Sequence, residues 1–274
     1  MNERDLDALH HHAPEGDTET QNYFRTVRTA WETLIGRVLP KSEDVQRTKV
    51  WKEERAGYLE FGDIISLTAR GEQLPIISVY PKSVEWNQQV VLWIDGQGKA
   101  GMFPDGKAHP NLLKLIDKGF SVVGIDLYGQ GEFTTNGVAL TENPTVDNPR
   151  QFAGFTYCYN DTVFARRVHD ILTVTAWVNG DEHSPKALHA LGVNGGAQLL
   201  AAARVIASDE FKTVAIDNDD FRFADLTSWK HADFLPGAIK YGDLPALLKI
   251  PGRNASAGDG VVTWDGTIDV FTAD

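Results

Sequence analysis

The chain has 274 residues, of which 42% are hydrophobic and 23% charged, so it is long enough to bury a core and does not have the composition of a disordered protein. Its formal net charge of −12 argues against a nucleic-acid partner, since such partners require a basic surface. No apolar run approaches the roughly 20 residues that span a bilayer, so no membrane association is expected. Cys158 is the single cysteine, which excludes an intramolecular disulfide and a multi-thiolate metal site.

The N-terminal region, residues 1–45, is expected to be a helical extension of the domain that follows. Its opening residues, MNERDLDALHHHAPEGDTE, have no apolar segment typical of a secretory signal. The triplet His10–His12 lies on this polar leader and is expected to be solvated rather than bound to a metal. The segment FRTVRTAWETLIGRVL predicts a helix that caps the domain. Its expected apolar face consists of Val27, Ala30, Leu34 and Val38.

Residues 46–274 are predicted to form one α/β domain. Two early strands, residues 57–69 and 73–81, are expected to pair antiparallel. Four apolar runs then predict strands buried on both faces, namely residues 89–95, 120–129, 187–193 and 211–219. Helices are predicted between them, at residues 111–119, 161–178 and 195–207. This alternation predicts a mostly parallel sheet with helices on both faces, a three-layer sandwich.

The C-terminal part of the domain is less regular. After Asp220 the pattern predicts loops and short helices, followed by a strand at residues 261–264 and a weaker strand candidate at 267–271. The far edge of the sheet therefore looks altered or truncated. An edge of this kind also allows pairing with a second copy of the chain, because unpaired edges invite association.

The third buried strand runs directly into Gly192-Val193-Asn194-Gly195-Gly196 and then into a helix. This context and spacing match the G-x-S-x-G nucleophile elbow of the α/β-hydrolases, with Asn194 where the serine should stand. The central residue of such a turn has a positive φ, which asparagine tolerates better than most residues other than glycine.

Several further segments resemble the acetyl xylan esterase-like branch of the α/β-hydrolases. They are WIDGQGKAGMF, KGFSVVGIDLYGQGEF, GFTYCYNDTVFARRVHDILT and FLPGAIKYGDLPALL, within residues 50–250. The resemblance implies carboxylic-ester hydrolysis, in particular deacetylation of a carbohydrate such as xylan. It also implies that no metal or organic cofactor takes part and that the protein is exported to the periplasm or the extracellular space.

The resemblance implies a Ser-Asp-His triad in which the histidine comes late in the chain. Asn194 has no hydroxyl proton for a base to remove and is not a usable nucleophile. The last histidine is His231, and with Asp219 at the end of the fourth buried strand it keeps the order nucleophile, acid, base. The alternative is that Asp219 caps a loop and His231 lies on a surface turn. The remaining histidines after the leader are expected to be structural or solvated: His109, His169, His183 and His189.

The resemblance also implies an oxyanion-binding site beside the elbow. Its donors would be the N–H of Gly195 and one N–H from the loop Gly96-Gln97-Gly98. Tyr128 follows the next strand and is expected to border the pocket, where its ring would stack on a sugar. Four more aromatic residues share this expectation, or else simply pack the loop: Phe133, Phe155, Tyr157 and Tyr159.

Two functions remain open from the sequence. The first is an esterase-like enzyme in which water attacks with the help of Asp219 and His231. The second is a catalytically inactive hydrolase fold used as a binding or assembly module. A further hypothesis rests on the Asn194-Gly195 pair, which is prone to deamidation and would then place a carboxylate at the nucleophile position.

Overall fold

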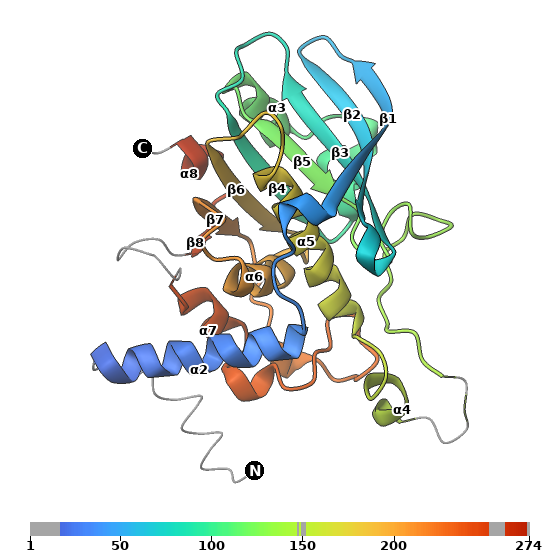
Figure 1. The fold of residues 1–274 in the computed structure, drawn as a ribbon, viewed down its shortest axis with the longest axis vertical. Coiled ribbons are helices and arrows are strands. Elements are labelled where there is room, and N and C mark those ends of the chain that lie inside the picture. The colour runs from blue at the N-terminus through green and yellow to red at the C-terminus, as the bar shows by residue number, and fades with distance from the viewer. Residues whose placement is uncertain (1–16, 147, 149–151, 252–260, 273–274) are drawn as a thin grey trace.

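The computed structural model describes residues 17–146, 148, 152–251 and 261–272, so His10–His12 lie outside the described residues. An eight-stranded sheet crosses the middle of the molecule and carries helices on both faces (Figure 1). Within the described ranges, no helix is both long and apolar enough to cross a bilayer.

The sheet is antiparallel at one end and parallel over the rest. Its spatial order is β1-β2-β3-β5-β4-β6-β7-β8. Strands β1, β2 and β3 form consecutive hairpins and β3 pairs antiparallel with β5, whereas all later neighbours are parallel. The strands are β1 (Val45–Glu54), β2 (Tyr58–Leu67), β3 (Glu72–Pro81), β4 (Gln89–Asp95), β5 (Ser121–Ile125), β6 (Ala187–Val193), β7 (Thr213–Ile216) and β8 (Val261–Thr263). The predicted α/β architecture is confirmed.

The helices divide between the two faces of the sheet because successive strand residues point to opposite sides. The helices are α2 (Asp17–Ile35), α3 (Pro110–Asp117), α4 (Ala153–Tyr157), α5 (Val163–Asn179), α6 (Ala197–Ile206), α7 (Asp243–Lys249) and α8 (Asp269–Thr272). Helices α2, α5, α6 and α7 contribute to the main core on one face, while α3 and α8 pack on the other.

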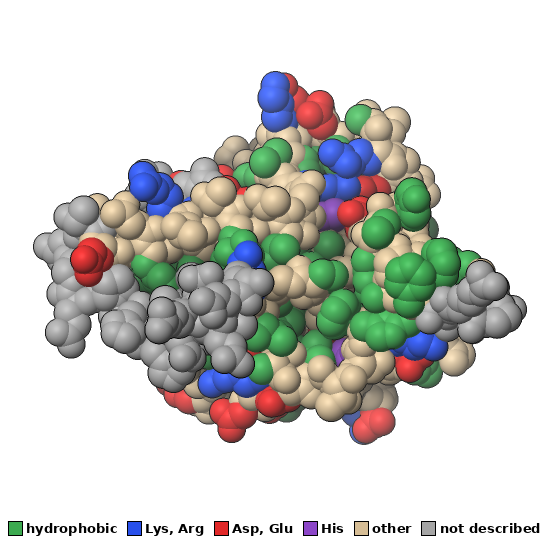
Figure 2. All heavy atoms as spheres, turned by 90° about the horizontal axis from the view of Figure 1, so that it is seen from below, with side chains coloured by type: hydrophobic (Ala, Val, Ile, Leu, Met, Phe, Trp, Pro, Cys, Tyr) green, Lys and Arg blue, Asp and Glu red, His purple; other side chains and the backbone are tan. Residues whose placement is uncertain are grey.

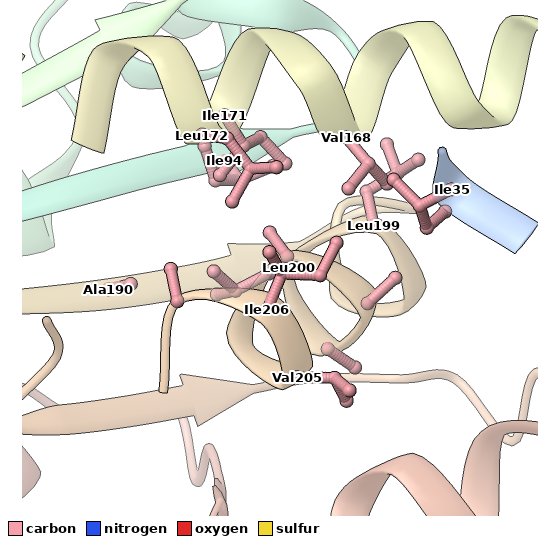
Figure 3. Close-up of a cluster of buried hydrophobic side chains, with 14 of the residues drawn as sticks. Ile35, Ile94, Val168, Ile171, Leu172, Ala190, Leu199, Leu200, Val205 and Ile206 are labelled. Carbon is pink, nitrogen blue, oxygen red and sulfur yellow. The ribbon is translucent and has the colours of Figure 1, made fainter. Parts of the chain in front are cut away.

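The main core lies between the sheet and the α5–α6 pair (Figure 3). Ile94 of β4 faces Ile171 and Leu172 of α5, and Leu199 and Leu200 extend the contact from α6. These five side chains are buried. The dense apolar contact holds the ends of β4 and β6 and the start of α6 in a fixed relation, which positions the turn between β6 and α6.

Strand β1 is an element that the sequence pattern does not reveal. Its residues VQRTKVWKEE are mostly exposed, so no apolar run marks them. The strand is held by its ladder to β2 and by Arg47, whose Nη2 lies 2.7 Å from the buried carboxylate of Asp63. The ring of Trp51 covers Gly62, where a Cβ would lie 2.1 Å from the indole.

The N-terminal helix differs from its prediction at both its end and its face. Helix α2 ends at Ile35 because Gly36 has a φ of 71°, and Val38, expected on the apolar face, is 76% exposed. Val27 of the predicted face is buried and Leu34 packs partly buried against the core, but the centre of the buried face is Val27, Trp31 and Ile35, spaced by one helical turn each. Trp31 is fully buried and its ring lies 5.5 Å from that of Phe223, so the helix is packed into the main core.

The C-terminal residues form one strand, and the second strand candidate was wrong. Residues 261–263 are strand β8, which pairs parallel with β7 at the edge of the sheet. Residues 269–272 are helical in α8, whose Phe271 is buried against the core on the α3 face. The short β8 is consistent with the altered sheet edge expected from the sequence.

Candidate functional site

The carboxyl ends of the parallel strands open toward the side of the molecule where α2 and α4 lie (Figure 1). The turn from β6 to α6 stands at this edge, where open α/β sheets place their ligands. Asn194 and Gly195 have φ values of 51° and 87°, and both are exposed. The sharp turn expected of a nucleophile elbow is therefore present, with Asn194 at its tip.

Glycines allow the elbow to lie against the end of β4. A Cβ on Gly96 would lie 2.0 Å from the carbonyl oxygen of Asn194, and one on Gly196 would lie 2.3 Å from that of Ile94. The N–H of Gly96 donates to the Asn194 carbonyl at 3.1 Å. The backbone of the neighbouring strand thus braces the elbow directly.

The side chain of Asn194 is held by a carboxylate. Its Nδ2 donates to Oδ2 of Asp95 at 2.9 Å. Asp95 is only 1% exposed, and its Oδ1 accepts from the N–H of Gln97 at 2.9 Å. A buried carboxylate needs donors to offset its desolvation, and Asn194 is one of them. The amide is therefore used as a donor to the protein rather than presented as an attacking group.

Two of the four predicted oxyanion donors are already occupied. The N–H of Gly96 is bound to Asn194 and that of Gln97 to Asp95. Gly98 is buried, and a Cβ there would lie 2.4 Å from Oδ1 of Asp126. In the described part of the chain, the N–H of Gly195 has no acceptor. Two of the four predicted donors are therefore occupied, and of the other two only Gly195 is exposed at the elbow.

The loop after β4 is fixed from the turn after β5. Gln130 is fully buried, and its Nε2 donates to the carbonyl oxygens of Asp95 and Gly96 at 3.3 and 3.0 Å. Asp126 accepts from the N–H groups of Lys99 and Glu132, both at 3.0 Å. These contacts make the strand-end loop rigid and bring Tyr128 to the edge of the sheet beside it.

His231 is paired with Asp233 rather than with Asp219. Its Nδ1 accepts from the N–H of Asp233 at 3.1 Å and lies 3.9 Å from Oδ2 of that residue. Within the described ranges, no hydrogen bond or ion pair joins His231 to Asp219. Asp219 is exposed with a φ of 45°, and its N–H bonds weakly to Asp217 at 3.4 Å, as expected for a loop residue.

The hydrogen bond at Nδ1 also decides the tautomer of His231. Because Nδ1 accepts a proton, the neutral ring carries its hydrogen on Nε2. A triad histidine has the opposite arrangement, with Nδ1–H donating to the acid and Nε2 free to accept. His231 in this conformation is therefore set up as a donor and not as a general base.

Asp233 was not predicted from the sequence and is bonded to the first turn of α6, the helix that follows the elbow. Its Oδ2 accepts from Nε2 of Gln198 at 3.2 Å, and Gln198 is the second residue of α6, four positions after Asn194. Burial raises the pKa of Asp233, against the opposing charges of Arg167 and His231. No periodic pattern marks residues 220–240, so the sequence offers no signal for this placement.

The other described histidines serve the fold. His109 caps α3, and its Nδ1 accepts from the N–H of Asn111 at 3.1 Å. Nε2 of His169 donates to the carbonyl of Ile35 at 2.7 Å. Burial lowers the pKa of His189 to about 4, so its ring is neutral at physiological pH. His183 is exposed and pairs with Asp181 at 2.6 Å. Among the described residues, no group of His, Cys, Asp and Glu side chains has a metal-binding arrangement.

The aromatic side chains expected near the pocket divide into two groups. Tyr157 packs on Trp229 and Phe234, and its hydroxyl donates to the Trp229 carbonyl at 2.6 Å, so it joins the loops together. Phe155 stacks on Phe152 in α4, and Tyr159 is 87% exposed. The Tyr128 and Phe133 rings pair at 6.3 Å. Figure 2 shows hydrophobic side chains gathered in the middle of the face seen from below.

Comparisons with known proteins support the fold. No family model matches the sequence, and no curated protein matches it. A structure from Bacteroides fragilis NCTC 9343, provisionally assigned as an acetyl xylan esterase, superposes with a TM-score of 0.66 at 13% identity, over 95% of this chain and 72% of that one. Acetyl xylan esterase 1 from Thermoanaerobacterium sp. JW/SL YS485 superposes with a TM-score of 0.51 at 14% identity, over 92% of this chain and 80% of that one.

At these identities the similarity concerns the fold. The chain has the α/β-hydrolase fold in the form found in acetyl xylan esterase structures, as the sequence predicted. Function must be argued from the site itself, because one fold hosts many activities.

Proposed function

We propose that this protein is a hydrolase-fold carbohydrate-binding protein that lacks the serine-nucleophile mechanism served by a G-x-S-x-G elbow. The observation that carries the proposal is the Asn194 amide, which donates to buried Asp95 at the position of the nucleophile. The tautomer of His231 supports it, since no base faces the elbow from that ring. The carbohydrate assignment draws on the acetyl xylan esterases of the same fold and on the Tyr128–Phe133 ring pair at the same edge.

The test is hydrolysis of a chromogenic acetyl ester, 4-nitrophenyl acetate, and of acetylated xylan. We expect the protein and its Asn194→Ala variant to release product at the same rate as a folded protein without an esterase site. The decisive second variant in the same hydrolysis assay is Asn194→Ser. We expect no gain of activity from it, because a serine there still lacks a base.

Two outcomes would contradict the proposal. Loss of a real activity in Asn194→Ala would show that position 194 takes part in the chemistry, and an intact mass one unit higher would then identify the deamidated form. Strong hydrolysis by Asn194→Ser would show that a functioning base survives. The carbohydrate-binding part of the proposal is tested separately by calorimetry with xylotriose and acetylated xylo-oligosaccharides. Absence of binding would refute that part.

A water-attack esterase is the second candidate. Its specific support is the pair of His231 and Asp233 beside α6, with the raised pKa of Asp233. If hydrolysis is found and survives Asn194→Ala, this candidate predicts that Asp233→Asn abolishes it. Asp219→Asn serves as the matched control and is expected to leave the rate unchanged, because Asp219 is an exposed loop residue.

A further inference from the structure

A pocket of about 610 Å³ lies at the carboxyl edge of the sheet, and no residue of the elbow lines it. It is open to solvent on one side and is lined by the segment after α2, the start of β3, the turn after β5 and the first half of α5. Pockets of 300–1,000 Å³ hold small organic ligands. None of residues 192–196 lines the cavity, so it is a site distinct from the elbow.

Three arginines and three acidic residues line the cavity, and only one arginine is paired with a carboxylate among the described residues. Arg37 is nearly buried and forms a bidentate salt bridge with Glu72, with N–O distances of 2.8 and 2.5 Å, so these two charges cancel. Arg70 and Arg166 also line the cavity and have no carboxylate partner among the described residues. Against them stands the exposed carboxylate of Asp161.

Asp170 is a buried carboxyl group that also lines this cavity. It is buried at the base of the cavity and accepts from the N–H of Tyr128 at 2.6 Å. Burial raises the pKa of Asp170 to about 8, so the carboxyl is protonated below that pH and presents a hydroxyl donor. His169 beside it has a pKa lowered by burial and is neutral. A chain with a net charge of −12 thus holds a cavity in which two guanidinium groups, Arg70 and Arg166, form no ion pair among the described residues.

One wall of the cavity is aromatic. The ring of Tyr128 lies 6.3 Å from that of Phe133, and the Arg166 guanidinium lies over the Tyr128 ring at 4.7 Å. Phe133 is 41% exposed although it is a large apolar side chain. The exposed Phe133 ring can accept the apolar C–H face of a sugar, while the guanidinium stacked over the Tyr128 ring keeps its N–H donors available to a carboxylate.

We propose that this cavity binds a uronic acid, whose carboxylate is taken by Arg70 and Arg166 and whose ring lies against Tyr128 and Phe133. The sugar part of this inference rests on the proposed carbohydrate-binding function. The carboxylate part rests on the two guanidinium groups without acidic partners. Asp161 and the protonated Asp170 supply polar partners for the hydroxyl groups of the sugar.

The test is titration calorimetry with D-glucuronate, with neutral D-glucose and acetate as comparison ligands. We expect glucuronate to bind and the two comparison ligands to bind at least about tenfold more weakly, since a charge-assisted hydrogen bond contributes about 1.5–3 kcal/mol. Arg166→Gln and Arg70→Gln should each weaken the binding of glucuronate by about tenfold. Arg25→Gln is the matched control, because Arg25 is an exposed guanidinium of α2 bonded only to Asn22 in the described chain, and its variant should bind as the unaltered protein does.

The outcomes separate this inference from the proposed function. Binding of xylotriose without a preference for glucuronate, or glucuronate binding unaffected by Arg166→Gln and Arg70→Gln, would overturn the uronate site and leave the carbohydrate-binding function standing. Acetate binding as tightly as glucuronate would reduce the cavity to a simple anion site and overturn the sugar assignment. No binding of any saccharide would refute both.

Discussion

The hydrogen bond between Asn194 and Asp95 should contribute measurably to stability. Replacing Asn194 by alanine removes the 2.9 Å bond to a carboxylate that is 1% exposed. A lost hydrogen bond to a buried charge costs about 1.5–3 kcal/mol. The φ of 51° adds about 1 kcal/mol for alanine, which tolerates the left-handed region less well than asparagine does. We therefore expect Asn194→Ala to lower the free energy of unfolding by about 3 kcal/mol.

Two companion variants separate the contributions. Asn194→Gly loses the bond but has no Cβ to strain the backbone, so it should be about 1 kcal/mol more stable than Asn194→Ala. Asn194→Asp, the deamidation product, places a second carboxylate against Asp95 and raises the pKa of the pair. Its stability should approach that of the unaltered protein in acid, where a proton is shared, and fall as the pH rises.

The measurement is urea unfolding followed by tryptophan fluorescence, at neutral and acidic pH. If the free energies of unfolding of Asn194→Ala and Asn194→Gly are both within about 0.5 kcal/mol of that of the unaltered protein, the bond to Asp95 contributes nothing to stability. The argument that Asn194 has a structural role in the elbow then fails. If Asn194→Asp shows no dependence on pH beyond that of the unaltered protein, the two side chains are not in contact in solution.

Three further predictions concern other parts of the molecule. Burial raises the pKa of Asp170 from near 3.8 to about 8, so the native state holds a proton that the unfolded chain releases, and stability falls as the pH rises between these values. Asp170→Asn should remove this slope and stabilise the protein at about pH 8 by on the order of 5 kcal/mol, with little change near pH 4, as measured by urea unfolding at both pH values. Trp31→Ala should cost about 3–5 kcal/mol in the same assay, because Trp31 is fully buried in the main core, and a loss under 1 kcal/mol would show that α2 is not docked as described. Gly96→Ala should cost about 1–3 kcal/mol, because its Cβ would lie 2.0 Å from the Asn194 carbonyl, whereas Gly57→Ala, with its nearest neighbour at 4.0 Å, should be close to neutral.

The sequence by itself determined the α/β architecture and the position of the elbow. Buried strands on both faces of a parallel sheet read as continuous apolar runs, and residues 89–95 and 187–193 match β4 and β6 residue for residue. The elbow was recognisable because its glycines are required by a local turn. Strand β1 escaped the same reasoning, since an exposed edge strand has no apolar pattern to detect.

Only the tertiary structure decided what the elbow residue does. Asn194 and Asp95 are 99 positions apart, and they meet because β4 and β6 are neighbours in the sheet. The pairing of His231 with Asp233, rather than Asp219, depends on the path of an irregular segment across the start of α6. The cavity that holds Arg70 and Arg166 likewise forms where the start of β3 meets α5. A linear pattern reports the local period and the burial of each element, whereas the chemistry of these sites is set by which element ends the packed core brings together.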